Sequence, residues 1–507
     1  MQVLHSLVVL VSLLASFLQC TDALPSPDFG VNATINPARS EVLSEALRLL
    51  AAFNEVSDVS VTLSSGTTIL TQMQTAIVSV GRKVQSSGVT LTQRLQTLAT
   101  SNGPSIPGAF NPVYEAIEAL NNLTTNGLNT EMMSIRAVVP SYVTQKFNEV
   151  FGDLRRALGQ LSGRLQTLER DVRNARTAAG NGNPITSTHV RNNVSAKTQS
   201  DVTKALVELR LKVTEVRYMV WTMLFYLKDA DSFLQDIVRQ VNGFGNALSF
   251  SLYQFSEGMN RLKLTVVQYS RSAFGCSLAE QNATLVQIVP ALSAIANFSS
   301  TLQQPLANLL TALTSPSLSS RVNSFVLGFD SYISGRVAAS NLMRQFLLSQ
   351  TCQLVRKVLL TLISFGPQNE FCFNRFSSRV FGIYELHHNC VSKCYEAELD
   401  RFTTVAQFLQ HAVDVLLYDV EDLADNLSVC VNLLEGRTTC IEQYGMLYTA
   451  VLREFTKMLN DTEKLYGEEF AASAKRLDAC LSSSQYTTLN AIRMNEQRLE
   501  ACQQYTT

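Results

Sequence analysis

Apolar residues recur at steps of three and four along two long stretches of this chain, and no other feature constrains the fold as strongly. The second stretch runs from Leu206 to Leu248 without losing the period. The first stretch contains Leu154, Leu158, Leu161, Leu165, Leu168 and Val172. A stripe of this period follows one face of an α-helix and needs an apolar partner. The sequence therefore predicts an all-α protein, an elongated helical bundle with long antiparallel coiled-coil-like hairpins.

The two stripes have two ways to be buried. Residues 177–200 are rich in Gly, Asn and Pro and predict an exposed turn, so the stripes can pack on each other as a hairpin. The alternative is a coiled coil between two chains. We favour the hairpin, because a tethered partner is present at high effective concentration. Gly152, Gly159 and Gly163 make the first stretch a poor helix in isolation, which favours the same choice.

The N-terminus has the pattern of a secretory signal. An apolar run from Leu7 to Leu18 is followed by Thr21 and Ala23, which suit signal peptidase, so residues 1–23 are predicted to be removed. The run is shorter than the roughly 20 residues that span a bilayer. The longest later apolar stretch, 219–227, is closed by charged residues. We therefore expect a secreted, extracellular protein with no transmembrane segment in the mature chain.

Seven sequons support this localisation, since each has Ser or Thr two residues after Asn and no Pro between. The candidate N-glycosylation sites are Asn32, Asn122, Asn193, Asn282, Asn297, Asn426 and Asn460. These positions are expected to face solvent.

Nine cysteines remain after the predicted cleavage, and all lie in the second half of the chain. In an oxidising compartment they predict a disulfide framework. The candidates are Cys276, Cys352, Cys372, Cys390, Cys394, Cys430, Cys440, Cys480 and Cys502. Nine is odd, so at least one thiol is free or bonds another chain, and a covalent dimer is one outcome.

Predicted turns indicate which cysteines meet. A reversal in "TSPSLSS", residues 314–320, would bring Cys276 and Cys352 to similar distances from the turn. A second reversal at 433–439, with Gly436 as a helix C-cap, would bring Cys430 near Cys440. The same reversal would place Cys390 or Cys394, which share one helical face, opposite Cys480.

The cysteine-rich tail predicts three helices, at about 391–429, 440–476 and 482–502. It resembles the tsetse EP-type domain of insect secreted proteins over about 120 residues. The resemblance rests on Cys390 and Cys394 before a long amphipathic helix, on the pair Cys430 and Cys440, and on Cys480 followed by Cys502. It implies an insect extracellular protein and brings no catalytic residues with it.

We expect four segments in the chain: a signal peptide (1–23), a cysteine-free long-helix domain (24–275), a helical hairpin (276–371) and a cysteine-rich helical domain (372–507). The formal net charge of -1 gives no bias toward nucleic acid. No zinc-protease or nucleophile-elbow motif is present, so no catalytic, cofactor-binding or metal-binding residues are predicted. The nearest approach to a metal-ligand cluster is His387, His388, Cys390 and Cys394, where disulfides compete for the thiols.

A cluster of arginines around the first stripe could bind an anionic partner, such as a sulfated glycan, although a solvated helix face is the simpler interpretation. Its members are Arg155, Arg156, Arg164, Arg170, Arg173 and Arg176. The favoured function is a non-enzymatic structural or interaction role toward protein or glycan partners. The alternative is carriage of a lipid or other small apolar ligand, in a bundle that opens at Gly243–Gly245 beside Trp221, Phe225 and Phe244.

Overall fold

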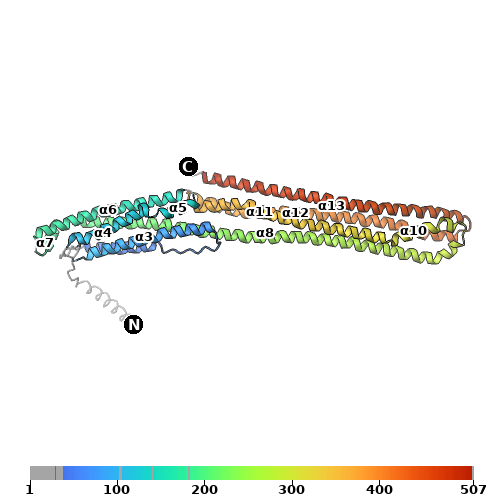
Figure 1. The fold of residues 1–507 in the computed structure, drawn as a ribbon, viewed down its shortest axis with the longest axis horizontal. Coiled ribbons are helices and arrows are strands. Elements are labelled where there is room, and N and C mark those ends of the chain that lie inside the picture. Colours follow the sequence, from blue (N-terminus) through green and yellow to red (C-terminus); the bar gives the residue numbers. More distant parts are fainter. Residues whose placement is uncertain (1–28, 30–37, 102–104, 140, 181–182, 505–507) are drawn as a thin grey trace, which may run out of the picture. The chain divides into compact units, whose positions relative to one another are not determined.

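The computed structural model describes residues 29, 38–101, 105–139, 141–180 and 183–504. Every regular element in this part of the chain is helical, which confirms the predicted all-α class (Figure 1). In chain order the elements are α2 (Ala38–Glu55), α3 (Thr68–Thr100), α4 (Ile106–Asn122), the π-helix η1 (Leu123–Gly127), α5 (Asn129–Val138), α6 (Tyr142–Ala179), α7 (Ser187–Asn193), α8 (Ala196–Ser293), α9 (Phe298–Thr301), α10 (Gln303–Thr314), α11 (Pro316–Ile363), α12 (Asn369–Asn432) and α13 (Arg437–Gln504).

The chain divides into two compact units. Unit 1 contains the residues up to Asp236, Lys357–Arg375 and the residues from Ala501, whereas unit 2 contains Ile237–Arg356 and Phe376–Glu500. This division differs from the predicted segments, because the expected boundary at residue 276 falls inside both α8 and unit 2. Cysteines begin there, but the apolar packing of the helix continues. The predicted signal, 1–23, lies outside the described residues.

In unit 1 the first heptad stripe and the beginning of the second lie on antiparallel neighbouring helices, as the sequence predicts, whereas the second stripe from Ile237 onward belongs to unit 2. Asp153 of α6 pairs with Lys212 of α8, with 3.7 Å between Oδ2 and Nζ. Further along, the Thr198 hydroxyl donates to Asp171 at 2.8 Å. The α6 position rises as the α8 position falls, which defines the antiparallel direction. All six stripe residues from Leu154 to Val172 are buried.

Further helices cover this hairpin. In α2, Glu45 lies 3.4 Å from the guanidinium of Arg210 in α8. The extended segment before α3 is fastened to α8 by Asp231, whose carboxylate accepts hydrogen bonds from the backbone N–H groups of Ser64 (2.8 Å) and Ser65 (2.9 Å). The stripes are therefore part of a multi-helix core, which explains why α8 is buried over more than one narrow seam.

Unit 2 is a four-helix bundle of α8, α10–α11, α12 and α13, in which helices consecutive in sequence run antiparallel (Figure 1). Ion pairs, hydroxyl contacts and a disulfide fix the register. These are Lys263–Asp330 at 2.6 Å between α8 and α11, Arg336–Asp478 at 2.8 Å between α11 and α13, Ser251–Ser392 at 2.7 Å between α8 and α12, and Cys394–Cys480 between α12 and α13. This up-and-down order needs only short connections.

The first reversal in unit 2 occurs at residues 294–297, and the predicted reversal at 314–320 is wrong. Asn297 supplies the left-handed backbone, with φ of 70°. Ser315 only separates α10 from α11. In this register, set by Lys263–Asp330, Cys276 lies level with the start of α11 while Cys352 lies in its last third. The predicted Cys276–Cys352 bridge is therefore absent, and both thiols are free and exposed.

The tail consists of two unbroken helices, so the predicted break between 476 and 482 is wrong. No Pro or Gly interrupts this part of α13, and Leu477 and Leu481 are buried in the continuing stripe. The predicted turn between α12 and α13 is present, and Gly436 takes the left-handed conformation with φ of 76°.

Among the described residues, the segment Ser320–Ile363 of α11 is long and apolar enough to cross a membrane on length and composition. Half of its most apolar window is buried inside the protein. A core helix of a bundle has the same composition, and α11 is one of the four helices of unit 2.

The core of unit 2 contains an uncharged histidine. His387 is fully buried, its Nδ1 lies 2.8 Å from the Thr488 hydroxyl, and its Nε2 has no hydrogen-bond partner in the described structure. Burial, followed by the charge of neighbouring His388, lowers the pKa of His387 from 6.5 to about 4. Protonation is therefore disfavoured in the folded protein.

We expect His387 to make unit 2 sensitive to acid. Above pH 6.5 the side chain is neutral in both the folded and the unfolded chain, so it does not lower the free energy of unfolding. Between pH 6.5 and 4 only the unfolded chain binds the proton, which lowers the free energy of unfolding by up to about 3 kcal/mol. Urea unfolding at several pH values should show this loss reduced in His387→Gln, whereas His411→Gln, at an exposed position, should behave as wild type.

Candidate functional site

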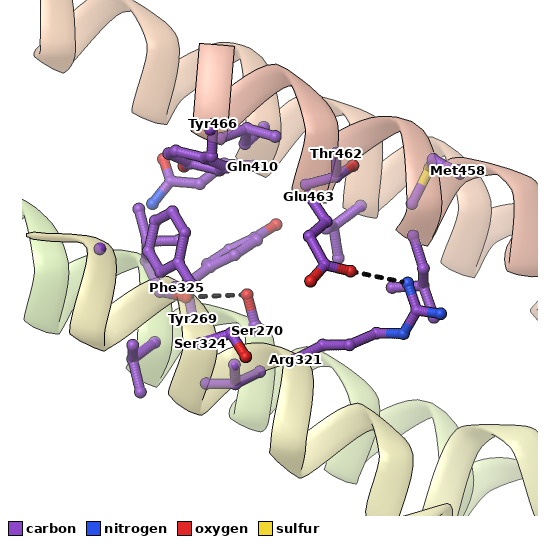
Figure 2. A pocket seen from close by; sticks show the side chains of 18 of the residues that line it. Tyr269, Ser270, Arg321, Ser324, Phe325, Gln410, Met458, Thr462, Glu463 and Tyr466 are labelled. Carbon is purple, nitrogen blue, oxygen red and sulfur yellow. Dashed lines mark hydrogen bonds and ion pairs between the residues drawn. The ribbon is translucent and has the colours of Figure 1, made fainter. Parts of the chain in front are cut away.

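A cavity of about 280 Å³ lies inside unit 2 and is lined by all four helices (Figure 2). Most of its walls are apolar side chains. They include Val266, Val267 and Phe274 from α8, Val322 and Phe325 from α11, Leu409 and Val413 from α12, and Met458 and Leu459 from α13. This volume is close to the lower end for small-molecule sites, and it holds on the order of ten non-hydrogen atoms.

Small residues at one level of the bundle explain the cavity. Ser270, Ser324, Gly328 and Gly467 all line it, so α8, α11 and α13 each contribute little volume there. A Cβ atom added to Gly328 would lie 2.9 Å from the Phe470 ring. The glycine therefore lets that ring lie against α11. These four positions are half-buried or exposed, so their small side chains leave the apolar residues behind them open on one side.

Aromatic rings pack beside the cavity. The centroids of Phe325 and Tyr466 are 3.9 Å apart, and those of Phe329 and Phe470 are 4.9 Å apart. Phe402 joins the same group from α12, 5.5 Å from Phe470. The first two of these contacts are edge-to-face and the third is tilted, and such contacts between rings help to hold the neighbouring helices in place.

The polar groups of the cavity are few. The Tyr466 hydroxyl is buried without a hydrogen-bond partner in the described structure, and burial raises its pKa. The Tyr269 hydroxyl donates to Asp414. Arg321 and Glu463 also line the cavity and form an ion pair with 3.2 Å between Nη1 and Oε2 (Figure 2). Both are partly exposed, so they mark the polar rim of an otherwise apolar site.

Two further hollows adjoin the cavity. One lies between α8, α10 and α11, shares Ser270, Phe274 and Val322 with the cavity, and contains Arg271. The other is a groove between α12 and α13 that shares Leu409, Met458 and Thr462 with it. The cavity therefore has three lining residues in common with each hollow.

Six of the nine candidate cysteines form disulfides. The pairs are Cys372–Cys502, Cys394–Cys480 and Cys430–Cys440. The turn at Gly436 correctly predicts the last two, while Cys372–Cys502 follows from the same register but was not predicted from the sequence. Cys276, Cys352 and Cys390 are free. Three disulfides fit an extracellular protein.

The candidate glycosylation sites are mostly exposed. Exposed side chains are found at Asn122, Asn282, Asn297, Asn426 and Asn460. Asn193 is half-buried and donates from Nδ2 to the backbone oxygen of His189 at 2.8 Å. Asn32 lies outside the described residues. Asn460 is two positions from Thr462, which lines both the cavity and the groove.

The proposed opening at Gly243–Gly245 and its aromatic pocket are not found. Trp221 donates its indole N–H to the Glu55 carbonyl oxygen at 3.2 Å and belongs to unit 1. Phe225 is about half exposed, and Phe244 packs in unit 2 against Tyr384. None of these three aromatic residues lines the cavity, and α8 continues helically through both glycines.

Most residues of the histidine and arginine clusters make contacts within the protein. Cys394 is bonded to Cys480, and no group of three or more His, Cys, Asp or Glu side chains in the described part of the chain could hold a metal ion. His388 Nε2 lies 3.3 Å from the Ser251 hydroxyl, on the contact of α8 with α12. Among the arginines, four are ion-paired with acidic residues of α6 or α8: Arg156, Arg164, Arg170 and Arg173.

No protein-family model, curated protein or solved structure matches this chain. The resemblance to the tsetse EP-type domain therefore stays a prediction that rests on cysteine spacing.

Proposed function

We propose that the protein is a secreted, non-enzymatic glycoprotein that carries a small apolar molecule in the cavity of unit 2. The observation that supports this most is the cavity itself, because its apolar walls are open to water on one side and a small apolar molecule would cover them. The apolar walls match an aliphatic ligand, and the partly exposed rim offers a place for a polar end.

Filling the cavity with protein should abolish binding. Val413→Phe adds volume at a lining position, so we expect the affinity for 1-decanol to fall more than about tenfold while the free energy of unfolding changes by less than about 1 kcal/mol. Wild type should bind 1-decanol with a Kd on the order of 10 μM, since each buried methylene contributes about 0.8 kcal/mol before the cost of association. Calorimetric titration measures both proteins.

Val420→Phe is the matched control. Val420 is one heptad further along α12, fully buried in the core, and lines neither the cavity nor the groove. The larger ring has no space there, so we expect a loss of about 1 to 3 kcal/mol in stability with decanol binding retained. Equal decanol affinity in wild type and Val413→Phe would refute the carrier proposal.

An interaction role is the second candidate, supported by exposed apolar side chains on α12. Phe408, Val415 and Tyr418 are 61%, 49% and 63% exposed, and the first two line the groove between α12 and α13. Exposed apolar groups gathered beside a groove are typical of partner sites. Phe408→Asp with Val415→Asp should leave decanol binding intact. A partner that co-purifies with the secreted wild-type protein should be lost from the secreted double variant.

A further inference from the structure

The charges around the cavity bear on which apolar molecule it takes, a question that rests on the proposed function. Arg321 is the cationic residue of the cavity lining, and the Arg321 side chain is about one-third exposed. Its guanidinium is held by Glu463, whose side chain is more than half exposed and free to turn into water. Figure 2 shows this pair at one side of the site, with Phe325 and Tyr466 at the other.

A second arginine lies at the adjoining hollow. Arg271 is exposed, and it makes no ion pair within the part of the chain that the structure describes. Because this hollow shares three residues with the cavity, a molecule that fills the cavity can extend toward it. Two guanidinium groups beside apolar walls favour an anionic end group on the ligand.

We propose that the ligand is a medium-chain aliphatic carboxylate, with its chain in the cavity and its carboxylate on Arg321 in place of Glu463. The planar guanidinium offers two parallel N–H donors, which match the two oxygens of a carboxylate. Binding exchanges one partner of Arg321 for another, so no buried cation is left unpaired. The released Glu463 becomes solvated, because its position is exposed.

Nearby acidic groups set the limits of this arrangement. Asp414 accepts a hydrogen bond from the Tyr269 hydroxyl, and the α12–α13 groove is lined by Asp419, Glu454, Asp461 and Lys457. Glu463 is the acidic group that is ion-paired with Arg321, so it competes directly with a ligand for that guanidinium. Removing its charge should strengthen carboxylate binding, an effect opposite to that of removing Arg321.

The test compares decanoate with 1-decanol at neutral pH on the full chain, by calorimetric titration. We expect decanoate to bind more tightly than decanol. Arg321→Gln should weaken decanoate about 3- to 10-fold and leave decanol unchanged, since a partly exposed charged hydrogen bond contributes at that level. Glu463→Gln should strengthen decanoate about twofold or more, again without effect on decanol.

Arg336→Gln is the matched control, because Arg336–Asp478 repeats the α11–α13 ion pair at the same sequence separation but does not line the cavity. Decanoate affinity in this variant should equal wild type. Decanol binding without tighter decanoate binding, or with no effect of Arg321→Gln on decanoate, would overturn the carboxylate inference alone. Failure of both ligands to bind would overturn the carrier proposal as well.

Discussion

Replacing Cys372 and Cys502 with Ala should lower the free energy of unfolding by about 3 to 4 kcal/mol. The bond joins α12 to α13, and Cys394–Cys480 is the next link along the same pair of helices. Cys372 and Cys394 are 22 residues apart, as are Cys480 and Cys502, so the bond closes a loop of that combined length in the unfolded chain. Loss of that closure gives the unfolded chain the corresponding entropy.

The double variant Cys276→Ala with Cys352→Ala is the control for this prediction. Both thiols are free and exposed, so no loop is opened and little packing is lost. Urea denaturation followed by circular dichroism should show an unchanged midpoint for this control and a lower one for the Cys372 and Cys502 variant. Equal midpoints for the two double variants would mean that Cys372 and Cys502 are not bonded.

Replacing Arg476 with Ala should cost about 2 to 4 kcal/mol, because it strips a buried carboxylate of its main partner. Glu398 is 2% exposed and accepts hydrogen bonds from Arg476 Nη2 at 3.1 Å and from the Ser473 hydroxyl at 2.7 Å. Burial alone would raise the pKa of Glu398, but the bonds from Arg476 and Ser473 outweigh it and hold that pKa below its usual value. Without Arg476, the effect of burial is no longer outweighed, so the pKa of Glu398 should rise.

Arg401→Ala tests the same carboxylate from the solvent side. Arg401 also pairs with Glu398, but its side chain is 53% exposed, so we expect a loss below about 1 kcal/mol. Adding Glu398→Gln to Arg476→Ala should recover part of the stability, since the buried charge is removed with its partner. Urea midpoints of wild type, Arg476→Ala, Glu398→Gln and the double variant measure the coupling; purely additive effects would contradict the buried pair.

The apolar patterns predicted most helices of this protein well, because the spacing of apolar residues along a helix indicates which of its faces is buried. The stripe residues from Leu154 to Val172 and from Leu206 to Ala230 are buried as their spacing indicates, and Gly436 follows α12 as a left-handed residue. The π-helix at Leu123–Gly127 and the unbroken α13 were not predicted. Gly127 ends the π-helix, whereas α13 continues unbroken through Gly445 and Gly467, so glycine positions alone do not predict either feature.

The cavity could not be predicted because it depends on register between distant helices. Ser270, Gly328 and Gly467 reach one level only when the chain reverses at Asn297, and Pro316 suggested a later turn. The shift moves every α11 residue along α8 and separates Cys276 from Cys352. Single-chain periodicity fixes which face of a helix is buried, while the turns decide what lies opposite it.

The central claim is that the cavity of unit 2 holds one small apolar molecule. Native mass spectrometry of the full chain incubated with 1-decanol tests it most directly, with Val413→Phe measured beside wild type. The account predicts a single bound decanol on wild type and none on Val413→Phe. Absence of the adduct from wild type, or its presence at equal intensity on both proteins, would contradict it.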